Sequence, residues 1–137
     1  MSYPEQVRIF GATPVQVDTR EEDGFRLTPQ ALEAALTPRT KAIILCTPSN
    51  PTGAAYAEEH LRPLCDVLRK HDCYIIVDEI YADLTYDGFK HVSLPALAPD
   101  LRDRIIVVDG VSKTYAMTGF RIGWSIAPAA LTKAIDM

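Results

Sequence analysis

Three short apolar runs constrain the fold of this chain more than any other feature of its sequence. They are residues 41–46, 74–77 and 104–108, and they are rich in isoleucine and valine. Runs of this length and composition predict strands that are buried on both faces of a sheet. Between the first two runs, apolar residues recur at helical spacing, at Leu61, Leu64, Cys65 and Leu68. Strand, helix and strand in this order predict a crossover between parallel strands, and therefore an α/β fold.

Residues 120–126 have a different pattern, because apolar residues alternate with others along them. The apolar members are Phe120, Ile122, Trp124 and Ile126. This alternation predicts a strand whose two faces meet different surroundings. We interpret it as the antiparallel member of a mixed sheet.

Capping residues and prolines set the expected limits of the helices. Thr28 and Pro29 are typical of an N-cap and a first helical position. Pro128 opens a last helical pattern near the end of the sequence. Pro63 lies inside the helical pattern between the first two strands, so it should either start the regular helix or kink it.

Composition excludes several classes of protein and partner. The 137 residues fit one domain on the scale of about 100 to 200 residues. The formal charge of -4 and the lack of a basic cluster argue against nucleic acid as a partner. No apolar run approaches the roughly 18 residues of a membrane-spanning helix, and no signal peptide opens the sequence, so we expect a soluble, cytoplasmic protein. The cysteines show no CxxC spacing, so we expect reduced, mostly buried thiols and no metal site.

Polar residues follow each of the three predicted parallel strands. In an open parallel sheet, ligands bind beyond the carboxyl ends of the strands. This rule selects residues 48–53, 78–81 and 109–113. We therefore expect a ligand site at this edge of the sheet.

Four residues near this edge each allow a functional and a purely structural interpretation. Asn50, between two prolines, is either an aimed amide or a turn asparagine. Asp78 needs a cation or a donor at the end of an apolar strand, or it caps the turn that follows. Lys113 is either a Schiff-base candidate or an exposed loop lysine. Arg121 suits either a phosphate group or a salt bridge.

Three motifs that contain these residues resemble a single family. The motifs are residues 50–53 (NPTG), 78–81 (DEIY) and 112–124 (SKTYAMTGFRIGW). They are similar to the large domain of fold-type I, pyridoxal phosphate (PLP)-dependent aminotransferases of class I/II, and most of all to bacterial aspartate aminotransferases. The resemblance covers essentially all of the chain. It implies the three-layer αβα fold of such large domains, with a mostly parallel sheet and one antiparallel strand.

The resemblance implies catalytic roles for Lys113, Asp78 and Tyr81. In this family the lysine at the Lys113 position forms an aldimine with PLP and moves a proton during transamination of an amino acid with a 2-oxo acid. The aspartate at the Asp78 position pairs with the protonated ring nitrogen, which keeps the ring able to accept electrons. The tyrosine at the Tyr81 position holds the phenolic oxygen of the ring.

The resemblance also implies that Asn50, Ser112 and Arg121 bind the cofactor. The asparagine at the Asn50 position shares the phenolic oxygen, and the arginine at the Arg121 position grips the phosphate in a bidentate pair. Two positions depart from the family. Gly110 stands where many relatives carry a phosphate-binding serine, and Asp109 stands where bacterial relatives commonly carry asparagine. A negative charge at Asp109 would weaken the phosphate site if it points inward.

The family pattern extends beyond both ends of this sequence. We expect residues 1–137 to be the central part of the PLP-binding large domain, without the N-terminal segment and without the small C-terminal domain that binds the substrate carboxylate. Members of the family are typically homodimers. Our hypothesis is an internal fragment of an aminotransferase with an aspartate-like substrate, which binds PLP weakly at best and whose activity alone is left open.

Other functions can be built on the same residues. A PLP-dependent lyase or decarboxylase would use the same lysine and aspartate, and a non-catalytic interaction module would keep the fold alone. Residues 74–79 also have the form of a Walker B strand. The glycines upstream of it are not followed by lysine, as a P-loop requires, so the sequence disfavours a nucleotide-dependent switch.

Overall fold

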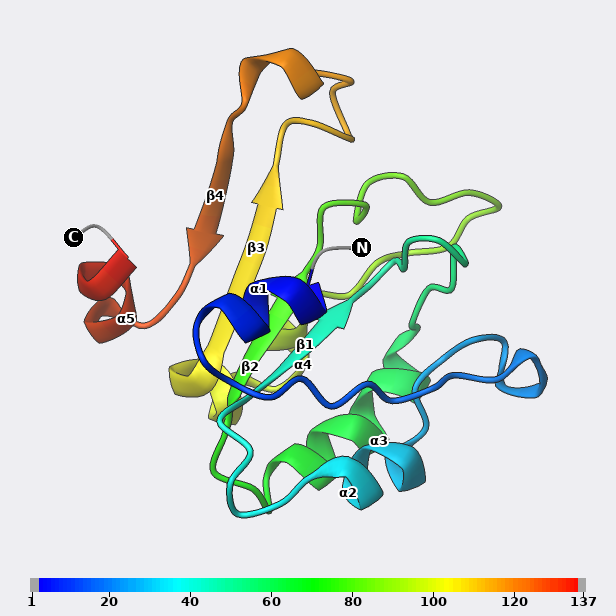
Figure 1. Ribbon diagram of the computed structural model, residues 1–137. Helices are drawn as coiled ribbons and strands as arrows, with labels where there is room; N and C mark the ends of the chain where they lie inside the picture. The colour runs from blue at the N-terminus through cyan, green and yellow to red at the C-terminus, as the bar shows by residue number, and fades with distance from the viewer. Residues whose placement is uncertain (1–2, 136–137) are drawn as a thin grey trace.

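The central element of the computed structural model, which describes residues 3–135, is a four-stranded sheet with the order β1-β2-β3-β4 (Figure 1). The strands are β1 (Ala42–Cys46), β2 (Tyr74–Asp78), β3 (Ile105–Gly110) and β4 (Gly123–Ile126). The first three are parallel, and β4 is antiparallel to β3. The predicted mixed sheet, mostly parallel with one antiparallel strand, is confirmed.

Helices connect and flank the strands. They are α1 (Tyr3–Ile9), α2 (Pro29–Ala35), α3 (Glu58–Leu68), α4 (Leu94–Leu97) and α5 (Ala129–Ile135), with 3-10 helices η1 (Glu21–Asp23), η2 (Pro99–Arg104) and η3 (Thr118–Phe120). The predicted start of α2 is confirmed, because the Thr28 hydroxyl accepts a hydrogen bond from the Ala31 amide at 3.2 Å. The idea that Pro63 starts its helix is wrong, since α3 begins at Glu58 and runs through Pro63. No helix within residues 3–135 is long and apolar enough to cross a membrane.

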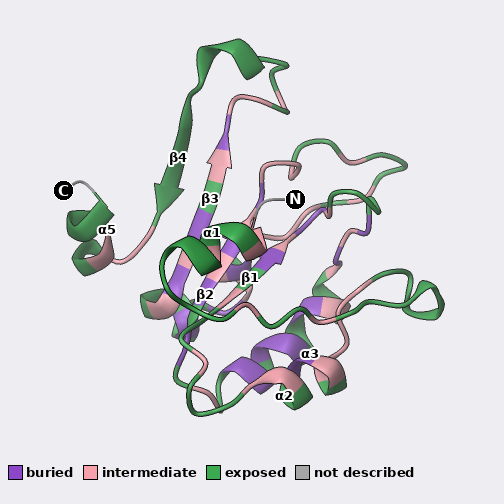
Figure 2. Ribbon diagram, viewed as in Figure 1, coloured by how far each residue is buried: buried purple, intermediate pink, exposed green. Residues whose placement is uncertain are grey.

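The hydrophobic core lies between α3 and one face of the sheet. Side chains alternate along a strand, so Ile75 and Val77 share the face that meets α3, and both are fully buried. From α3 they meet a stripe of buried residues at helical spacing, Leu61, Leu64, Cys65 and Leu68. Figure 2 shows the buried residues concentrated in α3 and in β1 to β3. Burial raises the pKa of the Cys65 and Cys73 thiols, and all three cysteines are free, as the sequence predicts.

The opposite face of the sheet is only partly covered. Ile44, Tyr74 and Val108 are 37%, 45% and 38% exposed, so the prediction of strands buried on both faces is wrong. Helix α1 lies on this side, because the Tyr3 hydroxyl donates a hydrogen bond to Asp78, whose side chain points away from the α3 face. Helices therefore flank both faces, but α1 is short and none of its residues is buried.

Strand β4 is shorter and more exposed than the alternating pattern predicts. It covers Gly123–Ile126 and not all of residues 120–126. Phe120 ends η3, and Arg121 has a left-handed backbone conformation with φ of 55°, which interrupts an extended strand. All four residues of β4 are exposed, so its two faces do not meet different surroundings in the described part of the chain.

Candidate functional site

The carboxyl ends of β1, β2 and β3 bring most of the predicted site residues to one edge of the sheet. Asn50 lies in the loop after β1, Asp78 is the last residue of β2, and Tyr81 follows in the next turn. Lys113 lies in the loop after β3. Because these strands are parallel and adjacent, residues up to 63 positions apart in sequence become neighbours, as the sequence predicts for an open parallel sheet.

Tyr81 links two of the other predicted residues. The Asn50 side-chain amide donates a hydrogen bond to the Tyr81 hydroxyl at 3.2 Å. The Lys113 ammonium lies 5.7 Å from the centroid of the Tyr81 ring, within the range of a cation–π contact. Three residues from three different loops therefore form one contiguous group. Lys113 itself is exposed, as the alternative interpretation of a loop lysine predicts.

Asp78 is held by two donors at the end of β2. Its Oδ1 accepts a hydrogen bond from the Ile80 amide at 3.1 Å, and its Oδ2 accepts one from the Tyr3 hydroxyl. The structural interpretation of Asp78 as a turn cap is therefore confirmed, and one oxygen serves it while the other faces α1. Burial and the hydrogen bond to Asp78 raise the pKa of the Tyr3 phenol above its usual range.

Tyr3 is a neighbour of the site that the sequence does not predict. It lies 75 positions from Asp78, and its surroundings in sequence contain no strand or motif that would place it there. Only the packing of α1 on the open face of the sheet brings the phenol to the carboxylate. A hydroxyl that donates to Asp78 keeps the carboxylate oriented without neutralising its charge.

Arg121 lies apart from the group around Tyr81. Its Nη1 donates to the Thr118 carbonyl oxygen at 3.0 Å, and its side chain is exposed. It makes no ion pair within residues 3–135, so the alternative interpretation of Arg121 as a salt-bridge residue is wrong. Ser112, next to Lys113, is half-buried. Lys113 thus contacts Tyr81, whereas Arg121 bonds its own turn.

The two departures from the family pattern, Asp109 and Gly110, contact each other. The Gly110 amide donates to Oδ1 of Asp109 at 2.6 Å, so this amide is engaged by the neighbouring side chain. A Cβ at Gly110 would lie 2.8 Å from the Ile122 carbonyl oxygen and 3.1 Å from the Gly123 Cα. A serine here would therefore collide with the backbone that leads into β4. The close approach of β3 and β4 requires glycine at this position.

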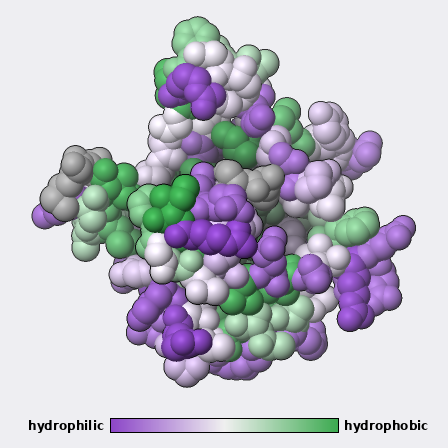
Figure 3. Space-filling view, in the orientation of Figure 1, coloured by the Kyte–Doolittle hydropathy of each residue, from purple (hydrophilic) through white to green (hydrophobic). Residues whose placement is uncertain are grey.

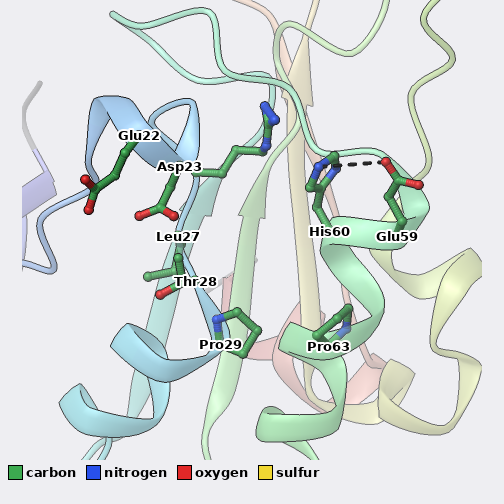
Figure 4. A pocket seen from close by; sticks show the side chains of 9 residues that line it. Glu22, Asp23, Leu27, Thr28, Pro29, Glu59, His60 and Pro63 are labelled. Atoms are coloured by element: carbon green, nitrogen blue, oxygen red, sulfur yellow. Dashed lines mark ion pairs between the residues drawn. The ribbon is translucent and has the colours of Figure 1, made fainter.

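Two open pockets lie elsewhere on the molecule. One of about 340 Å³ lies between η1, the start of α2 and the first turns of α3, and Figure 4 shows the charged side chains Glu22, Asp23 and Glu59 on its lining. A second, of about 620 Å³, shares part of this lining. None of the predicted site residues lines either pocket. Within residues 3–135, no three His, Cys, Asp or Glu side chains are grouped as a metal site requires.

The sequence of this chain matches the model of one known protein family. The family model for aminotransferase class I and II matches residues 1–137, which is the entire sequence. The chain belongs to this family.

Individual members of this aminotransferase family are similar to the chain in both sequence and structure. The chain is 47% identical over 135 residues to an aspartate aminotransferase of Geobacillus stearothermophilus, and 47% identical over 136 residues to an aspartate/prephenate aminotransferase of Cereibacter sphaeroides. Each alignment covers 98% of this chain and 34% of the relative. The crystal structure of an aspartate aminotransferase from Rhizobium meliloti superposes with a TM-score of 0.95 over 97% of this chain and 34% of that one. The chain thus spans about a third of the length of the relatives it matches.

Proposed function

We propose that this chain carries the PLP-binding and catalytic centre of an aminotransferase that exchanges the amino group of an aspartate-like amino acid with a 2-oxo acid. The observation that carries the proposal is the contact of Lys113 with Tyr81, which Asn50 also bonds, at the carboxyl ends of the parallel strands. Membership of the aminotransferase family supports the reaction class. The names of the relatives, which include aspartate and aspartate/prephenate aminotransferases, support a dicarboxylic substrate.

The chemistry of the donor set fits PLP. An amine, a carboxylate, a phenol and an amide lie at one edge of the sheet, and these groups match the aldehyde, ring nitrogen and phenolic oxygen of the cofactor. When bound, PLP supplies an electron sink for the bond that is broken at Cα of the substrate. Asp78 would hold the proton of the ring nitrogen, and Asn50 and Tyr81 would hold the phenolic oxygen. Lys113 would attach the cofactor and carry a proton at Nζ.

The phosphate side of the site is the weaker part. Ser112 and Arg121 would hold the phosphate, but the Arg121 guanidinium donates to the Thr118 carbonyl and would have to leave it. Gly110 offers no hydroxyl, and its amide is engaged by Asp109. These contacts support weak binding of PLP by residues 1–137, because the donors that would hold the phosphate are few or already paired.

We further propose that residues 1–137 are the central part of a PLP-binding large domain and that the whole protein is a cytoplasmic homodimer. The coverage of about a third of each relative supports the first statement. The open apolar face of the sheet and the exposed β4 support the presence of further structure against both, since exposed patches of this kind usually mark interfaces.

Covalent attachment of the cofactor tests the proposal. We expect that incubation with PLP followed by borohydride reduction adds one cofactor to the chain, and that peptide mapping places it on Lys113. Lys113→Ala should abolish the label, and Lys133→Ala, a matched control on α5, should retain it. A label that persists in Lys113→Ala, or that maps to another lysine in the unchanged protein, would contradict the assignment.

A further inference from the structure

A buried carboxylate lies directly behind the proposed site. Glu79 is 6% exposed and lies between Asp78 and Tyr81 in sequence. A charged group in such a position is costly unless it is paired. Its Oε1 accepts hydrogen bonds from the Ser93 hydroxyl at 2.9 Å and from the Leu94 amide at 3.3 Å. Glu79 therefore joins the end of β2 to the start of α4, 15 positions later.

His91 lies against the other oxygen of the same carboxylate. Its Nε2 is 3.3 Å from Oε2 of Glu79, and the two side chains are 11% and 8% exposed. Neither ring nitrogen of His91 has a hydrogen-bond partner within residues 3–135. The imidazole is thus placed to form an ion pair with Glu79 when it is protonated.

The backbone of Glu79 adds two further connections. Its amide donates to the Val108 carbonyl of β3 at 2.9 Å, and its carbonyl accepts from the Ala82 amide at 2.8 Å. Glu79 is thus bonded to β3, to the turn that contains Tyr81, and to the start of α4. The loop between these contacts is open to solvent, with Tyr86 76% exposed. The Glu79 carboxylate therefore holds the two ends of this loop together, next to Tyr81.

From this arrangement we propose that Glu79, with Ser93 and His91, is a positioning residue for the PLP site. Glu79 bonds both ends of the loop between β2 and α4, and in this way it fixes the turn that contains Tyr81. The phenol of Tyr81 is thereby kept in contact with Asn50 and Lys113. The role rests on the proposed function of that site. It goes beyond it because Glu79 faces away from the site, on the same face of the sheet as Val77, and touches neither Asn50 nor Lys113 in the described residues.

Hydrogen exchange of the chain without cofactor tests the mechanical part of the proposal. Glu79→Ala removes every side-chain contact of the network, Glu79→Gln keeps an acceptor for Ser93 and Leu94 but loses the charge beside His91, and Ser93→Ala removes one donor. The amides of Ala82 and Leu84 donate to the carbonyl oxygens of Glu79 and Tyr81, so they report on this turn. We expect both amides to exchange about tenfold faster in Glu79→Ala, with smaller increases in the other two variants. Ser93→Ala serves if Glu79→Ala does not fold.

Arg104→Gln is the matched control for these variants. Arg104 donates to the carbonyl oxygens of Leu68 and Cys73 at the opposite end of the sheet, so its loss also leaves part-buried polar groups without a donor, but far from Tyr81. It should leave exchange at Ala82 and Leu84 unchanged relative to the rest of the sheet. Equal increases in the control and in the Glu79 variants, or no increase in either, would overturn the positioning role.

The cofactor provides the second readout. In protein loaded with PLP, we expect Glu79→Ala to move the pH midpoint of the cofactor absorbance in the same direction as Tyr81→Phe, and Arg104→Gln to leave it in place. An unchanged midpoint in Glu79→Ala would overturn the proposal. If the unchanged protein takes up no PLP at Lys113, the proposed function fails, whereas the exchange measurement still decides whether Glu79 holds the Tyr81 turn.

Discussion

The two halves of the sheet differ sharply in how they are packed. Strands β1 to β3 rest on α3 with residues such as Ile75 and Val77 fully buried, whereas β4 and the residues of η3 before it are exposed (Figure 2). Figure 3 shows apolar surface over the end of α1 and around α5, where Ile9 and Ile135 are 79% and 58% exposed. The first half has a complete core on one side, and the second half lacks one within residues 3–135.

The proposed site lies at the boundary between these halves. Asn50 and Tyr81 follow strands of the packed half and contact each other, while Arg121 lies in the exposed half and bonds its own turn. Lys113 lies in the loop between the halves and contacts the packed side. Packing beneath a loop therefore governs which partners its side chains reach.

The largest expected contrast is in the free energy of unfolding. Leu64 is 2% exposed and Ile126 is 65% exposed. Leu64→Ala should lower stability by about 2–5 kcal/mol, because it opens a cavity in the packed half. Ile126→Ala should change it by about 0.5 kcal/mol or less. Urea unfolding of both variants measures the contrast, and similar losses for the two would show that β4 is packed as firmly as α3.

A smaller effect is expected where α1 meets the sheet. Tyr3→Phe removes the donor to Asp78 and should cost about 1.5 kcal/mol at pH 7, the low end for a hydrogen bond to a charged group because the phenol is partly exposed. The folded state raises the pKa of Tyr3 above its usual 10.0. This contribution is therefore complete below pH 10 and is lost as the pH rises through the folded pKa.

Unfolding of Tyr3→Phe and of the unchanged protein at neutral and alkaline pH checks this sign. The difference in stability between the two should shrink above pH 10. A difference that is constant from neutral to alkaline pH would mean that the phenol does not hold α1 through its proton.

The smallest expected effect lies on the surface of the packed half. Arg69 makes a bidentate pair with Asp100, at 2.7 and 2.9 Å, which links the C-cap of α3 to η2. The hydrogen bonds from Arg69 lower the pKa of the Asp100 carboxyl below its usual 3.8. The pair therefore stabilises the fold at neutral pH, and this contribution is lost as the pH falls through the folded pKa.

Asp100→Asn should be slightly less stable than the unchanged protein at pH 7. The loss in the free energy of unfolding should be smaller than in Leu64→Ala or Tyr3→Phe. The difference should vanish once the pH falls below the folded pKa of the carboxyl, and it should shrink at high salt, because both groups are exposed. A loss that persists in strong acid would indicate that Asp100 acts through packing and not through its charge.

The parts of the fold that sequence could predict depend on local signals. The strands β1 to β3 appear as short apolar runs. Thr28 caps α2 by a hydrogen bond to a residue only three positions away in sequence. The motif residues Asn50, Tyr81 and Lys113 could be predicted as one group because the ends of adjacent parallel strands converge. The sequence did not predict the solvent exposure of strand residues such as Ile44 and Trp124. Exposure depends on what packs against a face of the sheet and not on the residue itself.

The contacts that sequence missed join distant segments. Tyr3 reaches Asp78 across 75 positions, and Glu79 is bonded to residues near α4 across a solvent-exposed loop. The length of β4 depends on the left-handed backbone at Arg121, and an alternating pattern contains no signal of it. Each of these features is set by packing between elements.

Local patterns in the sequence are sufficient to predict the order and type of the main elements, the parallel direction of β1 to β3, and which residues meet at their carboxyl ends. Those properties follow from periodicity, capping and strand topology, which act over short stretches of chain. The tertiary structure decided which face of the sheet is buried, that Gly110 must be glycine beneath the approach to β4, and that Asp78 and Glu79 point to opposite faces with different partners. These depend on the distance between segments far apart in sequence, which local patterns do not encode.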